Sequence, residues 1–305
     1  MGPTTAGAAA PRREDLRELA DQAPDQLAMI GLDGGTFRMG SVDRLAYPQD
    51  GEGPVREVEV VPFAISATTV TVAEFARFTL AHGHVTDAEQ QGDSLVFDGN
   101  LDADLAESLP RVVGASWWCP VPGATWFAPE GPGSHVRGRE DHPVTHVSQR
   151  DALAYARWVG ARLPWEHEWE FAARGALEQQ PYPWGAVRDP GGVPRMNIFA
   201  GEFPDAPAGP VGTMPARSFA PNGYGLFNVT GNVWEWTQSP YGPDPQVPVM
   251  RGGSYMCHDS YCRRYRTSAR TSATADTSLG HAGFRLASGL RGTCAAESQV
   301  RQRVR

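Results

Sequence analysis

Residues 251–266 read RGGSYMCHDSYCRRYR, and both the fold and the chemistry of this chain can be argued outward from this stretch. Cys257 and Cys262 stand with four residues between them, a spacing that by itself fits two buried thiols or a disulfide. A closed zinc site uses about four nitrogen or sulfur ligands, and here only His258 stands beside the pair. Two thiolates without further partners suit Cu(I), a soft ion of low coordination number.

Arginines are concentrated around the second cysteine, at Arg263, Arg264, Arg266 and Arg270. In a chain with 27 Lys and Arg against 35 Asp and Glu, such arginines either pair with buried carboxylates or face solvent. No basic face stands out, so we expect neither a nucleic-acid nor a membrane partner. Because no apolar run approaches the roughly 20 residues that span a bilayer, and no secretory signal opens the sequence, we expect a cytoplasmic protein.

The chain has 305 residues, with 34 glycines and 26 prolines spread along it, which predicts many turns. Residues 1–27 are small, polar and interrupted by proline, with one helical stretch at 13–21, and we interpret them as a flexible tail. Residues 28–290 form the predicted single domain. Residues 291–305 form a second tail, which contains Cys294.

Hydrophobic spacing predicts a few regular elements within the domain. Residues 55–65 alternate like a strand. Residues 71–81 and 148–160 have helical spacing, each with a Ser or Thr cap and an acidic residue three positions later. A third helix is expected at 164–174, ending before Gly175. Few helices, short strands and long loops indicate an α+β fold.

Motifs of the common hydrolases and nucleotide enzymes are absent from the sequence. There is no HExxH, GxSxG, Walker or GxGxxG motif. His142 and His146 are four residues apart, but Pro143 argues against a helix that would bring them together. The glutamates at 166, 168 and 170 alternate along the third helix and fit structural or surface carboxylates.

Longer blocks of the sequence resemble the formylglycine-generating enzymes, or sulfatase-modifying factors. The similar blocks, in family order, are GGTFRMG (34–40), GHVTDAE (83–89), HPVTHVS (142–148), RLPWEHEWEFAARG (162–175), PNGYGLFNVTGNVWEW (221–236), RGGSYMCHDSYCRRYR (251–266) and HAGFRL (281–286). GNVWEW and the RLP…EWE block mark the wider superfamily. The block around the two cysteines is specific to the branch that oxidises cysteine.

The resemblance implies a C-type-lectin-like variant fold with little regular secondary structure. It also implies an oxidase that converts the cysteine of a sulfatase Cys-x-Pro-x-Arg segment, still unfolded, to Cα-formylglycine, using O2 and a thiol reductant. Cys257 and Cys262 would bind Cu(I), with the substrate thiolate as a third sulfur ligand, and Ser254 and Tyr261 would line the pocket. The substrate-binding positions that it implies are Trp234, Trp236, His258 and Arg270.

Calcium is a second metal that the resemblance implies. The turn that contains Gly231, Asn232, Val233 and Glu235 matches a structural calcium site built from oxygen ligands. Asn197 and the carbonyl of Ile198 match a second calcium site, although its usual aspartate is not evident in the sequence.

Several positions depart from the family pattern. Ala273 and Ala275 stand where many members have the Asn and Pro of Asn-Thr-Pro-Asp, which puts substrate recognition in question. Trp165 replaces the threonine that caps the third helix, at a cost of about 1 kcal/mol. Met196 and Leu286 replace cysteines that pair in some members. The loop at residues 203–211 and the link from 236 to 251 are short.

These departures leave two alternatives to a sulfatase-directed oxidase. One is a copper enzyme with the same cysteine pair that acts on another peptide or on a small thiol. The other is a non-catalytic binding module, against which the retention of both cysteines argues. Cys119, between Trp118 and Pro120, is expected to be a small buried hydrophobic residue, and Cys294 to have no role.

Overall fold

The computed structural model describes residues 11–290 of the chain. The helices are α1 (Arg13–Ala20), α2 (Val72–His82), α3 (Asp87–Gln91), α4 (Ala103–Ser108), α5 (Gln149–Trp158) and α6 (Glu166–Arg174), with short 3₁₀ turns at Pro48–Asp50, Asp98–Asn100 and Pro190–Gly192. The strands are β1 (Met29–Leu32), β2 (Gly35–Met39), β3 (Arg56–Val60), β4 (Phe63–Ser66), β5 (Asp93–Phe97), β6 (Trp118–Pro122), β7 (Gly201–Glu202), β8 (Ala206–Pro207), β9 (Trp234–Pro240), β10 (Pro248–Arg251), β11 (Arg270–Ser272), β12 (Ala282–Gly283) and β13 (Ala287–Gly289).

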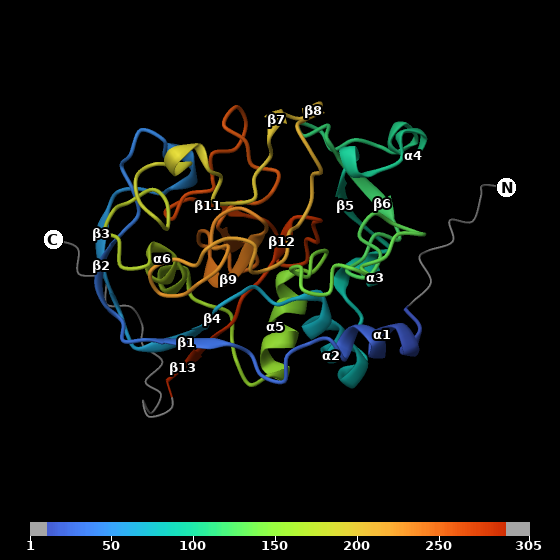
Figure 1. Ribbon diagram of the computed structural model, residues 1–305, viewed down its shortest axis with the longest axis horizontal. Helices are drawn as coiled ribbons and strands as arrows, with labels where there is room; N and C mark the ends of the chain where they lie inside the picture. Colours follow the sequence, from blue (N-terminus) through green and yellow to red (C-terminus); the bar gives the residue numbers. More distant parts are fainter. Residues whose placement is uncertain (1–10, 291–305) are drawn as a thin grey trace.

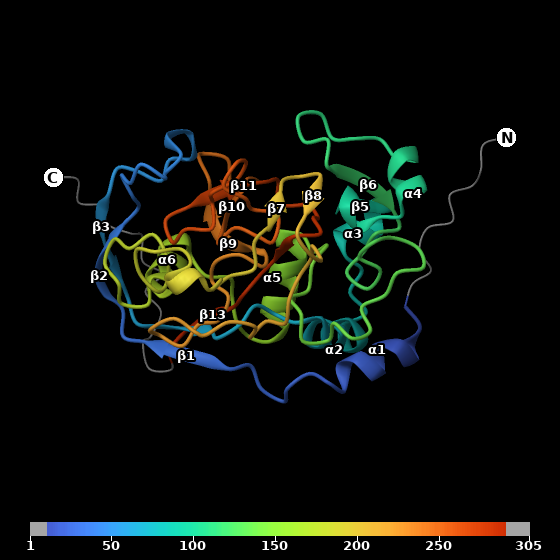
Figure 2. The same cartoon turned by 45° about the horizontal axis from the view of Figure 1, so that its top comes forward.

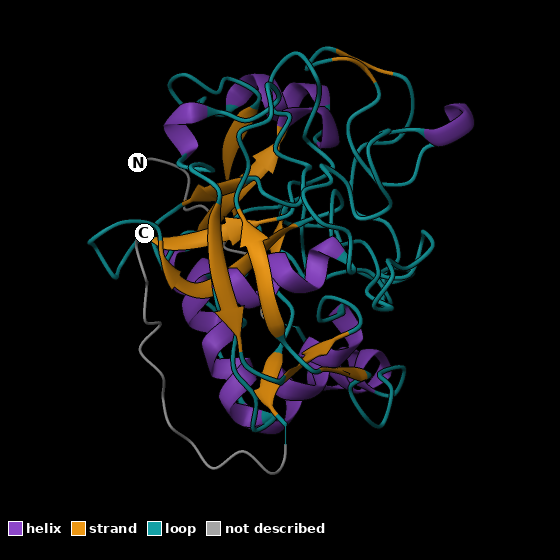
Figure 3. Cartoon of the chain, turned by 90° about the vertical axis from the view of Figure 1, so that its left-hand side faces the viewer, coloured by secondary structure: helices purple, strands orange, loops and turns teal. Residues whose placement is uncertain are grey.

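Two small sheets organise the middle of the molecule. One has the strand order β11-β10-β9-β12, with β12 parallel to β9, and the other has the order β1-β4-β13. Helices α5 and α6 flank β9 (Figure 1). The antiparallel pair of β2 and β3 lies at one end of the molecule, and the antiparallel pair of β5 and β6 lies at the other (Figure 2). Loops cover much of the rest (Figure 3), as the predicted α+β class requires.

The first two predicted domain helices are confirmed together with their caps. Thr71 precedes α2 and accepts a hydrogen bond from the backbone N–H of Glu74, whose carboxylate accepts from the N–H of Thr71 at 2.7 Å. Ser148 and Asp151 form the same reciprocal pair at the start of α5. Such pairs satisfy backbone donors that the first helical turn leaves unpaired.

The third predicted helix, α6, is also confirmed, but its start is built differently. Trp165 has no side-chain acceptor, and the backbone N–H of Glu166 instead donates to the hydroxyl of Ser239, at 2.8 Å. The N–H of Trp165 donates to the carboxylate of Glu168 at 2.9 Å. A residue 73 positions away therefore supplies part of the cap that threonine would supply locally.

Two expectations need correction. The predicted strand at 55–65 is two strands, because Pro62 lacks an N–H for the ladder: β3 pairs with β2, and β4 pairs with β1 and β13. The helix of the predicted N-terminal tail belongs to the domain. Leu16 and Leu19 of α1 are buried in the main core, and Arg77 of α2 donates to the carbonyl of Ala20. Residues 291–305, including Cys294, lie outside the described residues.

Cys119 is confirmed as a buried, free thiol, with no exposed surface, in a small cluster with Val96 and Val121. The main core is larger and gathers α1, α2, α5, β9 and the cysteine pair around Phe75, Tyr155 and Phe284. Within residues 11–290, no helix is both long and apolar enough to cross a bilayer.

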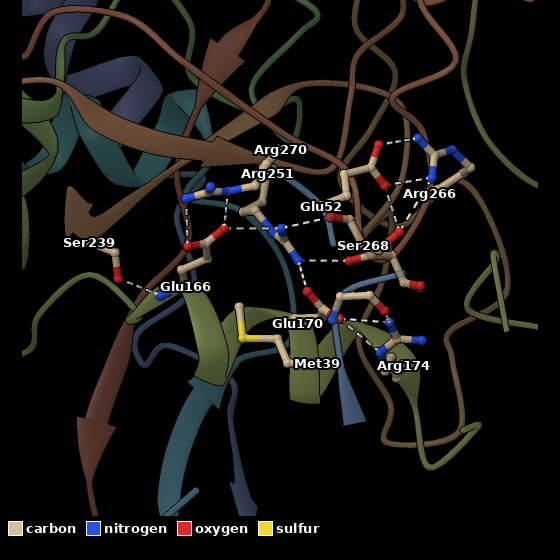
Figure 4. A network of polar contacts seen from close by, with 12 residues as sticks. Met39, Glu52, Glu166, Glu170, Arg174, Ser239, Arg251, Arg266, Ser268 and Arg270 are labelled. Atoms are coloured by element: carbon tan, nitrogen blue, oxygen red, sulfur yellow. Dashed lines mark hydrogen bonds and ion pairs between the residues drawn. The ribbon is translucent and has the colours of Figure 1, made fainter. Parts of the chain in front are cut away.

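A network of buried charges joins α6 to β10. The carboxylate of Glu170 lies between Arg251 and Arg174, and it also accepts from the backbone N–H of Gly40 at 2.7 Å (Figure 4). Glu166 accepts from Arg251 and from Arg270. The three glutamates of α6 are buried structural groups and do not face solvent.

The arginines after the second cysteine complete this network. Arg266 holds both carboxylate oxygens of Glu52, at 2.5 and 2.6 Å, while Arg264 holds Asp50. The sequence left open whether these arginines pair with buried carboxylates or face solvent, and three of the four pair. Because the carboxylates come from residues 50–52 and from α6, the pairs connect distant parts of the chain.

Glu170→Gln should lower the free energy of unfolding at pH 7 by about 3 kcal/mol, because Arg251 and Arg174 would lose the carboxylate that compensates their burial. Urea denaturation followed by circular dichroism measures this change. Glu178→Gln is the matched control, because the Arg38–Glu178 pair is exposed and 3.6 Å long, and it should cost less than about 1 kcal/mol. Equal losses in the two variants would contradict a structural role for the network.

The same carboxylate should make stability depend on pH. Burial raises the pKa of Glu170, but Arg251 and Arg174 outweigh burial and hold that pKa below its ordinary value. A lowered pKa in the folded state means that the stabilisation is complete above the unfolded value of about 4.3 and is lost as the pH falls through the folded pKa. The difference in unfolding free energy between the wild type and Glu170→Gln should therefore shrink below about pH 4.

Candidate active site

The two cysteines lie in the loop that connects β10 to β11, at residues 252–269. Gly253, at φ 73°, turns the chain where a side chain would meet the carbonyl of Arg264 at 2.9 Å. The N–H of Cys257 donates to the carbonyl of Ser254, and that of Cys262 to the carbonyl of His258, at 2.7 Å. These two tight turns place the sulfur atoms of Cys257 and Cys262 2.9 Å apart.

This distance is well beyond the roughly 2.05 Å of a disulfide, so both cysteines are free thiols. They are 1% and 6% exposed. A hydrogen bond from Cys257 lowers the pKa of Cys262, and Arg264, 4.0 Å from the Cys262 sulfur, adds to this effect. Burial, together with the proximity of Cys262, raises the pKa of Cys257. The pair therefore favours a thiolate at Cys262 that accepts a hydrogen bond from the S–H of Cys257.

An aromatic cluster of Trp117, Phe203, His258 and Tyr261 lies beside the cysteine pair. Tyr261 stacks on Phe203 with ring centroids 4.8 Å apart, and its edge meets Trp117 at 4.5 Å. His258 stacks more loosely on Phe203, at 6.4 Å. Tyr261 is 43% exposed, so this cluster forms an accessible apolar surface next to the buried sulfurs.

The hydroxyl of Tyr261 is available as a hydrogen-bond donor. Burial and the neighbouring sulfurs of Cys262 and Cys257 raise the pKa of Tyr261 to about 12, so the phenol stays protonated at neutral pH. Ser254 is fully buried. Its N–H points to the sulfur of Cys257 at 3.4 Å, and its hydroxyl accepts from the N–H of Met256. Ser254 and Tyr261 both lie close to the sulfurs, and their roles in the pocket stay predictions.

The remaining predicted substrate-binding residues do not join this surface. Trp236 has no exposed area, and its ring N–H donates to the carbonyl of Val147. Trp234 is 4% exposed in the same core. Arg270 holds both oxygens of Glu166 and lies over the ring of Tyr241. Of the four predicted substrate-binding residues, only His258 belongs to the aromatic cluster. The other three make these contacts within the fold.

The predicted calcium ligands are already engaged with protein groups. The carboxylate of Glu235 binds Arg285 through both oxygens and accepts from the ring N–H of Trp169. The amide oxygen of Asn232 accepts from Asn197 and from the N–H of Met214. Both oxygens of Glu235 and the amide oxygen of Asn232 therefore already accept hydrogen bonds from protein donors, and calcium at this turn stays a prediction.

The second predicted calcium position involves Asn197 and the carbonyl of Ile198, and it stays a prediction. The side-chain amide nitrogen of Asn197 donates to the carbonyl of Gly212. Within residues 11–290, no cluster of three or more His, Cys, Asp or Glu side chains could hold a metal ion. The cysteine pair fits a soft ion with two sulfur ligands.

A sequence model of the sulfatase-modifying factor enzyme 1-like domain matches residues 16–290. The chain belongs to this family. It is 49% identical to the formylglycine-generating enzyme of Thermomonospora curvata, over 88% of this chain and 97% of that protein. It is 44% identical to a protein of Bos taurus named inactive C-alpha-formylglycine-generating enzyme 2, over 86% of this chain and 88% of that protein.

The fold of this family member also resembles solved structures. PvdO from Pseudomonas aeruginosa superposes with a TM-score of 0.60 at 23% identity, over 86% of this chain and 94% of that one. At this identity the likeness supports the fold alone. The fold that the sequence blocks predicted is thereby confirmed, and the family match shows that α1 lies partly inside the domain boundary.

Sequence reasoning missed part of the site. Trp117 and Phe203 are distant from the cysteines in sequence, and no motif marked them. Asp50 belongs to an N-terminal loop that no sequence motif connects with the cysteines. The one signal in the sequence that pointed to such a partner is the arginine run. An arginine buried beside a cysteine needs a carboxylate, so Arg264 indicated that an acidic residue would lie nearby.

The thiolate at Cys262 can be tested by alkylation of the metal-free protein. At pH 7, iodoacetamide should modify Cys262, and Cys257→Ala should slow this reaction, because the variant loses the S–H donor that lowers the pKa of Cys262. Mass spectrometry of the tryptic digest measures the rate. Cys119, with no exposed surface, should stay unmodified as an internal control. An unchanged alkylation rate in Cys257→Ala would rule out the hydrogen bond from the S–H of Cys257 to Cys262.

Proposed function

We propose that this chain is an oxidase that converts the cysteine of a sulfatase Cys-x-Pro-x-Arg segment to Cα-formylglycine. The observation that supports this proposal is a buried pair of free thiols, 2.9 Å apart, beside an exposed aromatic surface. Family membership and the 49% identical relative named formylglycine-generating enzyme point to the same activity. Because another relative is named inactive, identity alone does not decide the matter, and the retained thiols favour activity.

Each group at the site has a chemical task in this reaction. Cys257 and Cys262 would hold Cu(I), which supplies a one-electron route to O2 when bound. The aromatic cluster would hold the substrate segment so that its thiol reaches the sulfurs, with Trp117 and Tyr261 as rings on which a proline could pack. The protonated phenol of Tyr261 would donate a hydrogen bond to a developing anion near the pair.

The electron balance of the overall reaction requires one external reductant. The substrate CH2–SH loses one hydrogen from Cβ and the hydrogen of its thiol, with two electrons, and becomes a thioaldehyde, which water hydrolyses to the aldehyde with release of hydrogen sulfide. O2 accepts four electrons, two from the substrate and two from a thiol reductant, and leaves as water. The site residues hold the thiol and exclude bulk water from the buried sulfurs.

A second candidate is an oxidase with the same cysteine pair and another thiol substrate. Ala273 and Ala275 favour it, because Ala273 offers no polar side chain where many family members have an Asn, and the buried Ala275 stands where they have a Pro. Under this candidate, the purified protein binds Cu(I) and consumes O2 with a different thiol but leaves the sulfatase peptide unchanged.

Copper-loaded protein with reductant and O2 should convert a Cys-x-Pro-x-Arg peptide to its aldehyde, seen as the mass change from CH2–SH to CHO. Cys262→Ser should abolish both conversion and O2 uptake, because one sulfur ligand is lost. Cys119→Ser is the matched control and should retain conversion, since Cys119 lies in a separate cluster. A wild-type protein that binds copper but leaves the peptide intact would contradict the sulfatase assignment.

Trp117→Ala should raise the KM for the peptide about tenfold and change kcat much less, because Trp117 would bind the segment away from the reacting atoms, unlike Tyr261 of the same cluster. Steady-state kinetics with varied peptide concentration separates the two parameters. Trp158→Ala is the control: this tryptophan is 37% exposed on α5 and packs on Phe78. A lower kcat with unchanged KM would place Trp117 in the chemistry and contradict a binding role.

A further inference from the structure

The N-terminal loop at residues 41–54 lies against the second cysteine through its 3₁₀ turn. The hydroxyl of Tyr47 accepts a hydrogen bond from the backbone N–H of Arg263, at 3.1 Å. The ring of Tyr47 lies 4.6 Å below the guanidinium of Arg264. Asp50 accepts from Nε and Nη2 of Arg264, at 2.5 and 2.9 Å. A segment more than 200 residues away in sequence therefore fixes the Arg264 side chain.

The orientation of this guanidinium matters because its third nitrogen faces a sulfur. Asp50 occupies the Nε–Nη2 edge, which leaves Nη1 directed to the sulfur of Cys262 at 4.0 Å. Because the guanidinium is a rigid planar fork, a carboxylate on one edge fixes where the remaining nitrogen points. The sulfur of Cys262 thus meets the positive end of the Arg264–Asp50 pair.

The neighbouring arginines are turned to other partners. Arg263 lies over the ring of Tyr47 with its charged carbon 5.3 Å from the centroid. Arg266 is engaged by both oxygens of Glu52. Arg264 is also well shielded, with a side chain 22% exposed beside an Asp50 that is 8% exposed. Its charge is therefore screened less by solvent than that of a surface arginine.

Two cysteine thiolates that share one Cu(I) carry a net charge of −1, and here they would carry it at 1% and 6% exposure. A buried charge of this kind needs a compensating charge or hydrogen-bond donors. We propose that Arg264, oriented by Asp50 and Tyr47, is a positioning residue that balances this charge and thereby raises the affinity of the cysteine pair for Cu(I). The inference rests on the copper binding of the proposed function and assigns a task to residues outside the cysteine motif.

The test is the Cu(I) affinity of the full-length protein, measured anaerobically by competition with a coloured Cu(I) chelator. Arg264→Gln should weaken Cu(I) binding at least about tenfold, because a unit charge about 4 Å from the sulfur is removed. Arg264→Lys keeps the charge and should recover most of this loss. Arg263→Gln is the matched control, one residue away and over the same ring, and its affinity should stay within about twofold of the wild type.

Arg264→Gln leaves Asp50 without its cation, which could unfold the loop, so the double variant Asp50→Asn with Arg264→Gln removes both partners together. It should still weaken Cu(I) binding, by less than Arg264→Gln because the negative charge of Asp50 is removed with it, at a thermal midpoint close to that of the wild type. An affinity equal to that of the wild type in a folded Arg264 variant would overturn the inference and leave the proposed function standing. A wild type that binds no Cu(I) would overturn both.

Discussion

A carboxylate in an apolar interior must meet cations and N–H donors, and this constraint at Glu170 determines how the molecule is assembled. Glu170 is fully buried and is matched by Arg251, Arg174 and the backbone N–H of Gly40. Those partners come from the end of β10, from the next turn of α6 and from the end of β2. One buried group therefore orients a helix, a strand and an N-terminal loop relative to one another.

This assembly matters for the site because the cysteine loop begins where β10 ends. Arg251 is the last residue of β10. Arg264 and Arg266 in the loop, and Arg270 at the start of β11, each pair with a carboxylate from a distant segment. The loop has little regular structure of its own, so ion pairs hold its shape in place of a backbone ladder. Rigid support of this kind keeps the two sulfurs of the loop 2.9 Å apart.

The sequence predicted α2, α5 and α6, whose signals are local, but it did not predict the short helices α3 and α4. Thr71 with Glu74, and Ser148 with Asp151, satisfy backbone donors within one helical turn, so neighbouring residues suffice to predict them. The helix at 13–20 was also recognised, but its place in the domain was not, since burial of Leu16 and Leu19 depends on α2. The prediction of a single strand at 55–65 was wrong at Pro62, because proline has no N–H and the hydrogen-bond ladder ends there.

The sequence by itself determined the cysteine pair, the arginines around it and the family to which the chain belongs, because these are properties of residue type and short spacing. Only the tertiary structure decided what surrounds the pair. It brought Trp117 and Phe203 to Tyr261, and Asp50 to Arg264, and it buried Trp236 in the core. It also committed Glu235 to Arg285. These contacts join residues far apart in the chain, and their partners are selected by packing and charge compensation, which a local pattern does not contain.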